Sequence, residues 1–136
     1  ETLSNILDKA HDQYGQYVLF DFHSMPSETD NIRNKVDIIL GNCHGQSCDE
    51  NVINFLEKNL SAKGLKTRRN TPYSGGFITE NYGDPKKNKH TIQIEINRSI
   101  YLDERTREKN NNFENCKLVF CDMINEFEKN KNNLLG

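Results

Sequence analysis

Hydrophobic and polar residues repeat with two different periods along the chain, and the change of period separates the expected elements. Residues 2–14 carry apolar side chains at helical spacing, namely Leu3, Ile6, Leu7, Ala10 and Tyr14. Gly15 follows, at a position where glycine commonly ends a helix. The pattern predicts an amphipathic helix that leads directly into the next segment.

Residues 17–26 form an apolar run that ends in an acid, a histidine and a proline: Tyr-Val-Leu-Phe-Asp-Phe-His-Ser-Met-Pro. Because alternate residues of a strand share a face, Asp21 and His23 lie on one side, with Phe20 and Phe22 on the other. Large apolar groups occur on both sides, which predicts a buried central strand. Its polar residues come at the carboxyl end, where open α/β sheets bind ligands.

Asp21 and His23 have two interpretations. A carboxylate beside an imidazole can fix its tautomer, whether the imidazole is a metal ligand or a base. In the other interpretation, both side chains only satisfy hydrogen bonds of a local turn. The stretch by itself is compatible with either.

Shorter runs give the next strands and loops. Residues 27–35 are polar and without periodicity, and residues 36–40 are an apolar run typical of a second buried strand. Residues 65–70 predict a short, charged strand near an edge of the sheet. Residues 71–76 form a turn-rich loop, and residues 84–89 a basic loop.

Ser47 and Glu50 have the spacing of a capping box, which predicts the start of a helix over residues 48–63, with Gly64 at its end. The buried stripe of this helix consists of Val52, Ile53, Leu56 and Leu60.

The strand expected over residues 91–98 alternates most clearly. Three isoleucines, at 92, 94 and 96, face one way, and Glu95 lies at the centre of the polar face. Such alternation ordinarily means that one face contacts water. The alternative is that the polar face lines a polar cavity.

The remaining residues complete the order α-β-β-α-β-(short α)-β-α. Residues 77–82 predict a short helix, 101–112 an irregular segment and 130–136 a frayed tail. Between them, a long helix has its core stripe at Phe113, Cys116, Val119, Phe120, Met123, Ile124 and Phe127. We expect residues 1–136 to form a single α/β domain, with a mostly parallel or mixed sheet flanked by helices.

Composition excludes several classes of function. The net charge of −2 gives no electrostatic case for binding nucleic acid or an anionic membrane, and no apolar run is long enough to span a bilayer. The four cysteines, without a secretory signal, favour reduced thiols and a cytoplasmic location. The spacing of Cys43, His44 and Cys48 is too loose to favour a structural zinc site.

Six motifs, in order and spacing, resemble the N-formylglutamate amidohydrolase family. They are Asp21-Phe-His-Ser-Met-Pro26, Asp37-Ile-Ile-Leu-Gly41, His44-Gly-Gln-Ser-Cys48-Asp49, Pro72-Tyr-Ser-Gly-Gly-Phe-Ile-Thr79, Tyr82-Gly83, and Gln93-Ile-Glu-Ile-Asn-Arg98 followed by Tyr101-Leu-Asp-Glu104. The resemblance implies a fold similar to that of the zinc carboxypeptidases and aspartoacylases. It implies a zinc-dependent hydrolase that releases formate from N-formyl-L-glutamate or a related small N-acyl amino acid.

The resemblance also implies roles for individual residues. His23 falls on a zinc ligand and Glu95 on the general base, while Asp21 suits a carboxylate that holds the imidazole of His23. Asn97 and Arg98 fall on polar positions beside the base. We expect both to bind substrate, since the planar fork of Arg98 can hold a carboxylate through two hydrogen bonds.

Residues 72–79 fall on a loop expected to cover the substrate. Tyr73 in this loop is expected to donate to a developing oxyanion, or else merely to pack, and Gly75 and Gly76 are expected to approach the substrate. His44, in a tight turn before a helix, is expected to border the same cleft.

The chain departs from the family in ways that affect these expectations. Members run to about twice this length, so the chain resembles the carboxy-terminal half, and one imidazole cannot complete a catalytic zinc site. We therefore expect the other zinc ligands outside this chain, little activity of the chain alone, and self-association through an exposed apolar face beside residues 17–22. Asn42-Cys43 and Asn70-Thr71 replace the Asp-Arg and Asn-Asp pairs of the family. The alternative function is a non-catalytic domain that binds a small acid or a partner protein.

Overall fold

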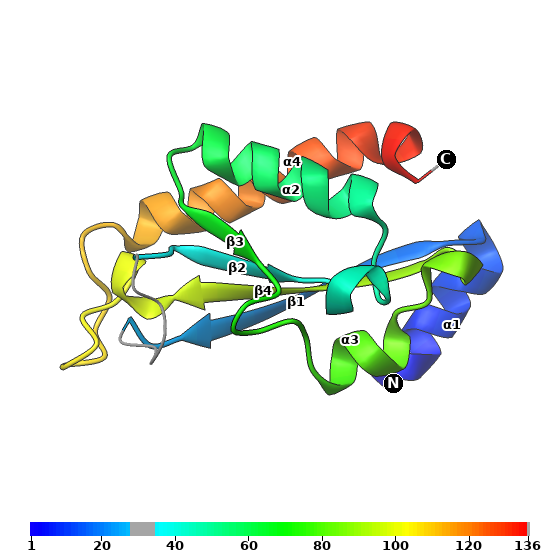
Figure 1. The fold of residues 1–136 in the computed structure, drawn as a ribbon, viewed down its shortest axis with the longest axis horizontal. Helices are drawn as coiled ribbons and strands as arrows, with labels where there is room; N and C mark the ends of the chain where they lie inside the picture. The colour runs from blue at the N-terminus through cyan, green and yellow to red at the C-terminus, as the bar shows by residue number, and fades with distance from the viewer. Residues whose placement is uncertain (28–34, 136) are drawn as a thin grey trace.

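A computed structural model describes residues 1–27 and 35–135. Most of the loop expected over residues 27–35 lies outside the described residues. The helices and strands occur in the expected order (Figure 1): α1 Leu3–Tyr14, β1 Tyr17–Met25, β2 Ile38–Gly41, η1 Cys43–Gly45, α2 Glu50–Ala62, β3 Thr67–Arg69, α3 Phe77–Tyr82, η2 Pro85–Lys87, β4 Lys89–Asn97, η3 Arg98–Ile100 and α4 Phe113–Leu134.

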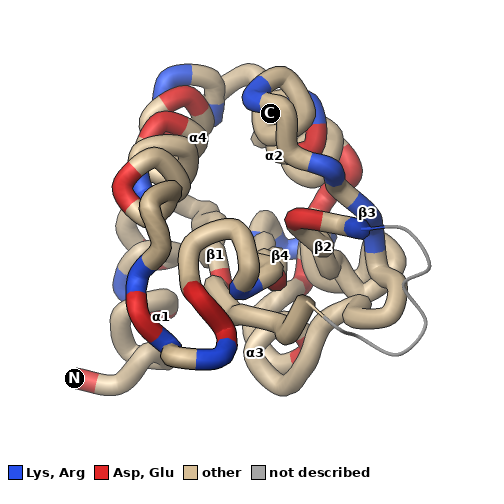
Figure 2. The backbone as a smooth tube through the Cα atoms, turned by 90° about the vertical axis from the view of Figure 1, so that its left-hand side faces the viewer, with Lys and Arg blue, Asp and Glu red and all other residues tan. Residues whose placement is uncertain are grey.

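The four strands form one mixed sheet in the order β1-β4-β2-β3. Strands β1 and β4 are parallel, β4 and β2 antiparallel, and β2 and β3 parallel. Figures 1 and 2 show three layers, with α2 and α4 on one face of the sheet and α1 and α3 on the other. The expected α/β architecture, a mixed sheet flanked by helices, is confirmed.

The main core lies between the sheet and the layer of α2 and α4. Ile92 and Ile94 of β4 and Leu40 of β2 are fully buried there. They pack against the stripes expected on the two helices, which include Val52, Ile53, Leu56, Leu60, Cys116, Phe120, Met123 and Phe127. Each fully buried aliphatic side chain contributes about 1.5–3 kcal/mol to folding. Among the described helices, none has the length and apolarity needed to cross a bilayer.

Strand β1 lies at an edge of the sheet, so the prediction of a central strand covered on both sides was wrong. On one face of β1, Phe20 and Phe22 contact Phe127 and Phe120 of α4 with ring centroids 5.2 and 5.6 Å apart. Phe22 remains 43% exposed. The alternation of residues along β1 does not indicate whether the strand has a neighbour on one edge or on both.

A groove of 520 Å³ runs between β1 and α4, and its apolar lining includes Val18, Phe20, Ile124 and Phe127. Ile124 and Tyr14, at the same groove, are 41% and 67% exposed. The chain therefore has the expected apolar surface beside β1. Self-association through this surface stays a prediction.

Two further local predictions were wrong. Helix α2 begins after Asp49, whose Oδ1 accepts from the Asn51 backbone N at 2.9 Å. Ser47 is not its cap, since its Oγ donates to the Thr91 carbonyl at 2.8 Å and so ties the loop to β4.

Residues 130–134, part of the expected frayed tail, are helical, because α4 continues to Leu134. Leu134 and Leu135 pack against the main core, and the Leu135 backbone N donates to the Lys131 carbonyl at 2.9 Å. This apolar contact explains why the helix runs past residue 130.

Candidate active site

The pairing of β1 with β4 places His23 directly opposite Glu95. His23 Nδ1 lies 3.8 Å from Glu95 Oε1, and His23 Nε2 lies 2.9 Å from Asp21 Oδ2. The predicted convergence of Asp21, His23 and Glu95 is therefore confirmed. Asp21 and His23 share a face because they are two residues apart on a strand. All three residues lie in the carboxyl-terminal part of two neighbouring parallel strands.

The Asp21 contact orients the imidazole of His23. A carboxylate accepts but does not donate, so Nε2 carries the proton that it receives, and in the neutral ring Nδ1 keeps its lone pair. That lone pair faces the Glu95 carboxylate, at a distance too long for a hydrogen bond. The His23 side chain is 44% exposed, so a ligand can reach it from solvent.

Glu95 is a buried carboxyl group on the polar face of β4, and the residue is only 7% exposed. Its neighbours across the sheet are His23 on β1 and the apolar Ile39 on β2. Gln93 Nε2 donates to Glu95 Oε1 at 2.8 Å. The expectation that this face contacts water was wrong, since Thr91, Gln93 and Asn97 are also buried. That the face lines a polar cavity stays a prediction.

Burial raises the pKa of the Glu95 carboxyl above its ordinary value, and the charge of Asp21 raises it further. Three neighbours lower this pKa without reversing the shift, namely His23, the hydrogen bond from Gln93 and the charge of Arg98. A carboxyl group with a raised pKa is a better proton acceptor once ionised, which suits a general base.

Replacing Glu95 by Gln is expected to raise the midpoint of thermal unfolding at neutral pH. The pKa of Glu95 is raised on folding, so its stabilising effect is complete below the unfolded-state pKa and is lost as the pH rises through the folded-state pKa. The Gln variant lacks this loss, and its advantage should vanish below the ordinary glutamate value of 4.5. Melting curves across this range test the expectation, with the exposed Glu80→Gln as control. An equal shift in both variants would contradict it.

Asn97 and Tyr73 have structural contacts beside the site. Asn97 Nδ2 donates to the Val36 carbonyl and Asn97 Oδ1 accepts from Ser99 N, both at 3.0 Å. Tyr73 packs against the small cluster that contains Val36 and Ile39. Since Ile39 lies opposite Glu95, Tyr73 borders the site, while the Asn97 amide mainly secures the end of β4.

The loop before α3, which contains Gly75 and Gly76, approaches the sheet closely at Gly41 of β2, where a Cβ would lie 2.7 Å from the Ser74 carbonyl carbon. Gly75 has a φ of +146°, and a Cβ there would lie 2.6 Å from Cys43 Sγ. A Cβ on Gly76 would lie 3.5 Å from Gln93 Oε1, beside the partner of Glu95. The Gly76 N–H already donates to Thr79 Oγ1 at 2.8 Å, so these glycines serve packing in the observed contacts.

Arg98 follows β4 directly, and its Nε donates to Ser24 Oγ at 3.2 Å. Ser24 alternates with His23 along β1 and so points to the opposite face. The Arg98 guanidinium therefore lies at the strand ends rather than directly over the His23–Glu95 pair. Its charge still acts on the Glu95 carboxyl, whose pKa it lowers.

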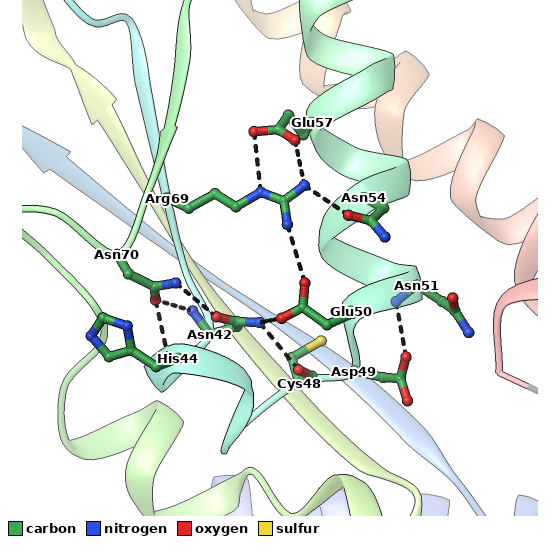
Figure 3. A network of polar contacts seen from close by, with 10 residues as sticks. All are labelled: Asn42, His44, Cys48, Asp49, Glu50, Asn51, Asn54, Glu57, Arg69 and Asn70. Carbon is green, nitrogen blue, oxygen red and sulfur yellow. Dashed lines mark hydrogen bonds and ion pairs between the residues drawn. The ribbon is translucent and has the colours of Figure 1, made fainter.

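His44 lies in the short η1 helix with an exposed ring. Figure 3 shows it beside Asn70, whose Oδ1 accepts from the His44 backbone N at 3.4 Å. The same segment is joined to the loop before α3, because Cys43 N donates to the Ser74 carbonyl at 2.8 Å. Among the described residues, no contact brings the His44 ring to His23 or Glu95.

Comparison with known proteins identifies the family of the chain. The sequence profile of the N-formylglutamate amidohydrolase family matches residues 1–102. The chain belongs to this family. A N-formylglutamate deformylase of Pseudomonas putida is 35% identical over 106 residues, and one of Pseudomonas aeruginosa is 31% identical over 107.

The crystal structure of N-formylglutamate amidohydrolase from Ralstonia eutropha JMP134 superposes with a TM-score of 0.84 at 28% identity, over 89% of this chain. The matches cover 76% of this chain but 40% of each Pseudomonas relative, and 45% of the Ralstonia chain. The chain thus spans less than half the length of these amidohydrolases.

The donors of this chain do not by themselves fit a catalytic zinc. Within residues 1–27 and 35–135, no group of three or more His, Cys, Asp or Glu residues could hold a metal ion. The site contains a single imidazole, and one of its ring nitrogens is already bound to Asp21. A catalytic zinc commonly uses about three protein ligands.

A polar network that sequence reasoning missed joins Asn42, after β2, to Asn70, after β3 (Figure 3). Asn70 Nδ2 donates to Asn42 Oδ1, and Asn70 Oδ1 accepts from Asn42 N, each at 3.0 Å. Asn42 Nδ2 also donates to Glu50 Oε1, and Arg69 joins Glu50 to Glu57 across β3 and α2. These hydrogen bonds tie the segment after β2 to the segment after β3.

Proposed function

We propose that this chain provides part of the active site of an amidohydrolase that cleaves N-formyl-L-glutamate, or a related N-acyl amino acid, to formate and the free amino acid. The observation that carries the proposal is the pairing of His23 with Glu95 across β1 and β4, with Asp21 holding the ring. The names of the relatives, N-formylglutamate deformylase and amidohydrolase, support this choice of substrate.

Glu95 acts as general base in the proposed reaction. Its ionised carboxylate takes a proton from the water whose oxygen forms a bond to the formyl carbon. The C–N bond then breaks, and Glu95 gives this proton to the leaving nitrogen, which yields formate and the amino acid. Burial supports this role, because it raises the pKa of Glu95 and makes the carboxylate more basic.

His23 is the residue of this chain that would bind a zinc ion, which, when bound, would polarise the formyl oxygen and acidify the water. Asp21 supports the role by fixing the ring. The described residues do not complete such a site, so the proposal requires further ligands from elsewhere. The likeness to the zinc carboxypeptidase fold stays a prediction.

We propose that the further zinc ligands come from a polypeptide segment that pairs with the free edge of β1. β1 has a partner strand on one side only, within the described part of the chain, and it carries both Asp21 and His23. The apolar groove along β1 and α4 offers surface for a packed segment. A polypeptide that corresponds to the unmatched part of the Pseudomonas relatives fits this position, because pairing with β1 would bring it beside His23.

Co-expression of this chain with the unmatched part of the Pseudomonas putida deformylase tests the proposal. We expect the two polypeptides to copurify and to release formate from N-formyl-L-glutamate when zinc is supplied. Release should be lost with His23→Ala, while the Glu80→Gln control keeps it. A complex that forms but releases no formate would contradict the proposal and favour a domain that only binds a small acid.

A further inference from the structure

The turn after β4 contains a second group of charged residues, which the proposed hydrolysis does not use. A hollow of 370 Å³ is lined there by Arg98, Leu102, Glu104 and Arg107. Arg107 lies beyond residues 1–102, the segment that the family profile matches. Membership of the family therefore does not account for this part of the hollow.

Two guanidinium groups line the hollow without an ion pair to any described residue. Arg98 uses Nε to bind Ser24, and its terminal nitrogens have no ion pair with any described residue. The Arg107 guanidinium has no hydrogen bond or ion pair within the same described part of the chain. Both groups keep donors that can bind an anion.

Glu104 forms no ion pair with Arg98 or Arg107, although the charge of Arg98 contributes to lowering the pKa of its carboxyl, and its oxygens bind Ser27. The Ser27 backbone N donates to Glu104 Oε1 at 2.9 Å, and Ser27 Oγ donates to Oε2. These hydrogen bonds hold the pKa of Glu104 below its ordinary value, so the group is ionised at neutral pH. The lining then carries two positive charges and one negative charge, which favours a single anionic group.

The turn that presents Arg107 is held by its own hydrogen bonds. Asp103 Oδ1 accepts from Arg105 N at 2.9 Å, and the Asp103 carbonyl accepts from Arg107 N at 2.7 Å. Asn110 Nδ2 donates to the Ser99 carbonyl at 3.2 Å, which ties the turn to η3. The hollow is therefore part of a defined structure in which Arg107 and Arg98 line one space.

We propose that Arg98 and Arg107 form a carboxylate subsite, which binds the side-chain carboxylate of an acidic N-acyl amino acid. The proposal rests on the proposed function for its substrate class. Two arginine forks suit one carboxylate, and Leu102 offers an apolar contact for the methylene groups that precede it. Arg98 lies three residues after Glu95, directly after the end of β4, and its positive charge acts on the Glu95 carboxyl.

Binding of N-acetyl-L-glutamate and N-acetyl-L-glutamine to the 136-residue chain tests the subsite. The two compounds have the same length and differ at the end of the side chain, which is a charged carboxylate in the first and a neutral amide in the second. We expect the glutamate compound to bind more tightly, and Arg107→Gln to reduce its affinity by about 10- to 100-fold, to that of the glutamine compound. Titrations followed by backbone amide NMR report both the affinity and any loss of fold.

Arg105→Gln is the matched control, because it removes the same charge from the same turn without changing the lining of the hollow. Three results would each overturn the subsite. The first is an equal loss of affinity in both variants, and the second is a preference for the glutamate compound that survives in Arg107→Gln. The third is the absence of any chemical-shift change at the amides of Leu102 and Arg107. Discrimination by the isolated chain without formate release by the complex would overturn the proposed function alone. Formate release with an unchanged KM in Arg107→Gln would overturn the subsite alone.

Discussion

Replacing Glu95 by Gln is expected to lower kcat for formate release by about 10²- to 10⁴-fold in the complex of this chain with the complementing polypeptide. The amide keeps the size of the side chain but cannot accept the proton of the attacking water. Binding should change little, since Glu95 is proposed to move a proton rather than to hold substrate. Steady-state assays of formate release measure kcat and KM separately.

The pH profile distinguishes a base from a merely structural residue. Activity that depends on ionised Glu95 should rise with pH along a limb above the ordinary glutamate value of 4.5, because burial raises the pKa. Glu80→Gln, which removes an exposed carboxylate from α3, should keep the wild-type profile. Wild-type kcat in Glu95→Gln would show that another group accepts the proton.

The parts of the fold that local pattern determines were predictable from the sequence. The alternation of residues 91–98 determines which face of β4 joins the core, and this placed Glu95 on the buried polar face. The convergence of His23 with Glu95 followed from their places near the carboxyl ends of two strands. Gln93 was also within reach of such reasoning, because it lies two residues before Glu95 on the same face.

Features that depend on long-range pairing were not predictable in this way. Nothing in the apolar run of β1 indicates that it forms an edge, since this depends on which other strands are present. Ser47 has the spacing of a cap, yet its hydroxyl binds Thr91, which lies 44 residues away in the chain. The pairing of Asn42 with Asn70 and the position of Arg107 beside Arg98 likewise arise from tertiary contacts.

Zinc binding should separate the isolated chain from the complemented enzyme most sharply. Purified alone and dialysed against equimolar zinc, the 136-residue chain is expected to hold much less than one zinc ion per molecule. The physical reason is the donor set, because His23 is the only imidazole at the site and one of its ring nitrogens is bound to Asp21. With one protein nitrogen instead of about three ligands, the ion keeps most of its water and dissociates readily.

In the complex with the complementing polypeptide, metal analysis should find about one zinc ion per complex, consistent with a completed catalytic site. His23→Ala should reduce this content, while His44→Ala, which removes an imidazole outside the observed site, should leave it unchanged. Added zinc should raise the unfolding midpoint of the complex and not that of the chain alone, because an ion stabilises only the state that binds it. Stoichiometric zinc in the isolated chain that is lost in His23→Ala would contradict the expectation, and would show that this chain completes the site with its own residues.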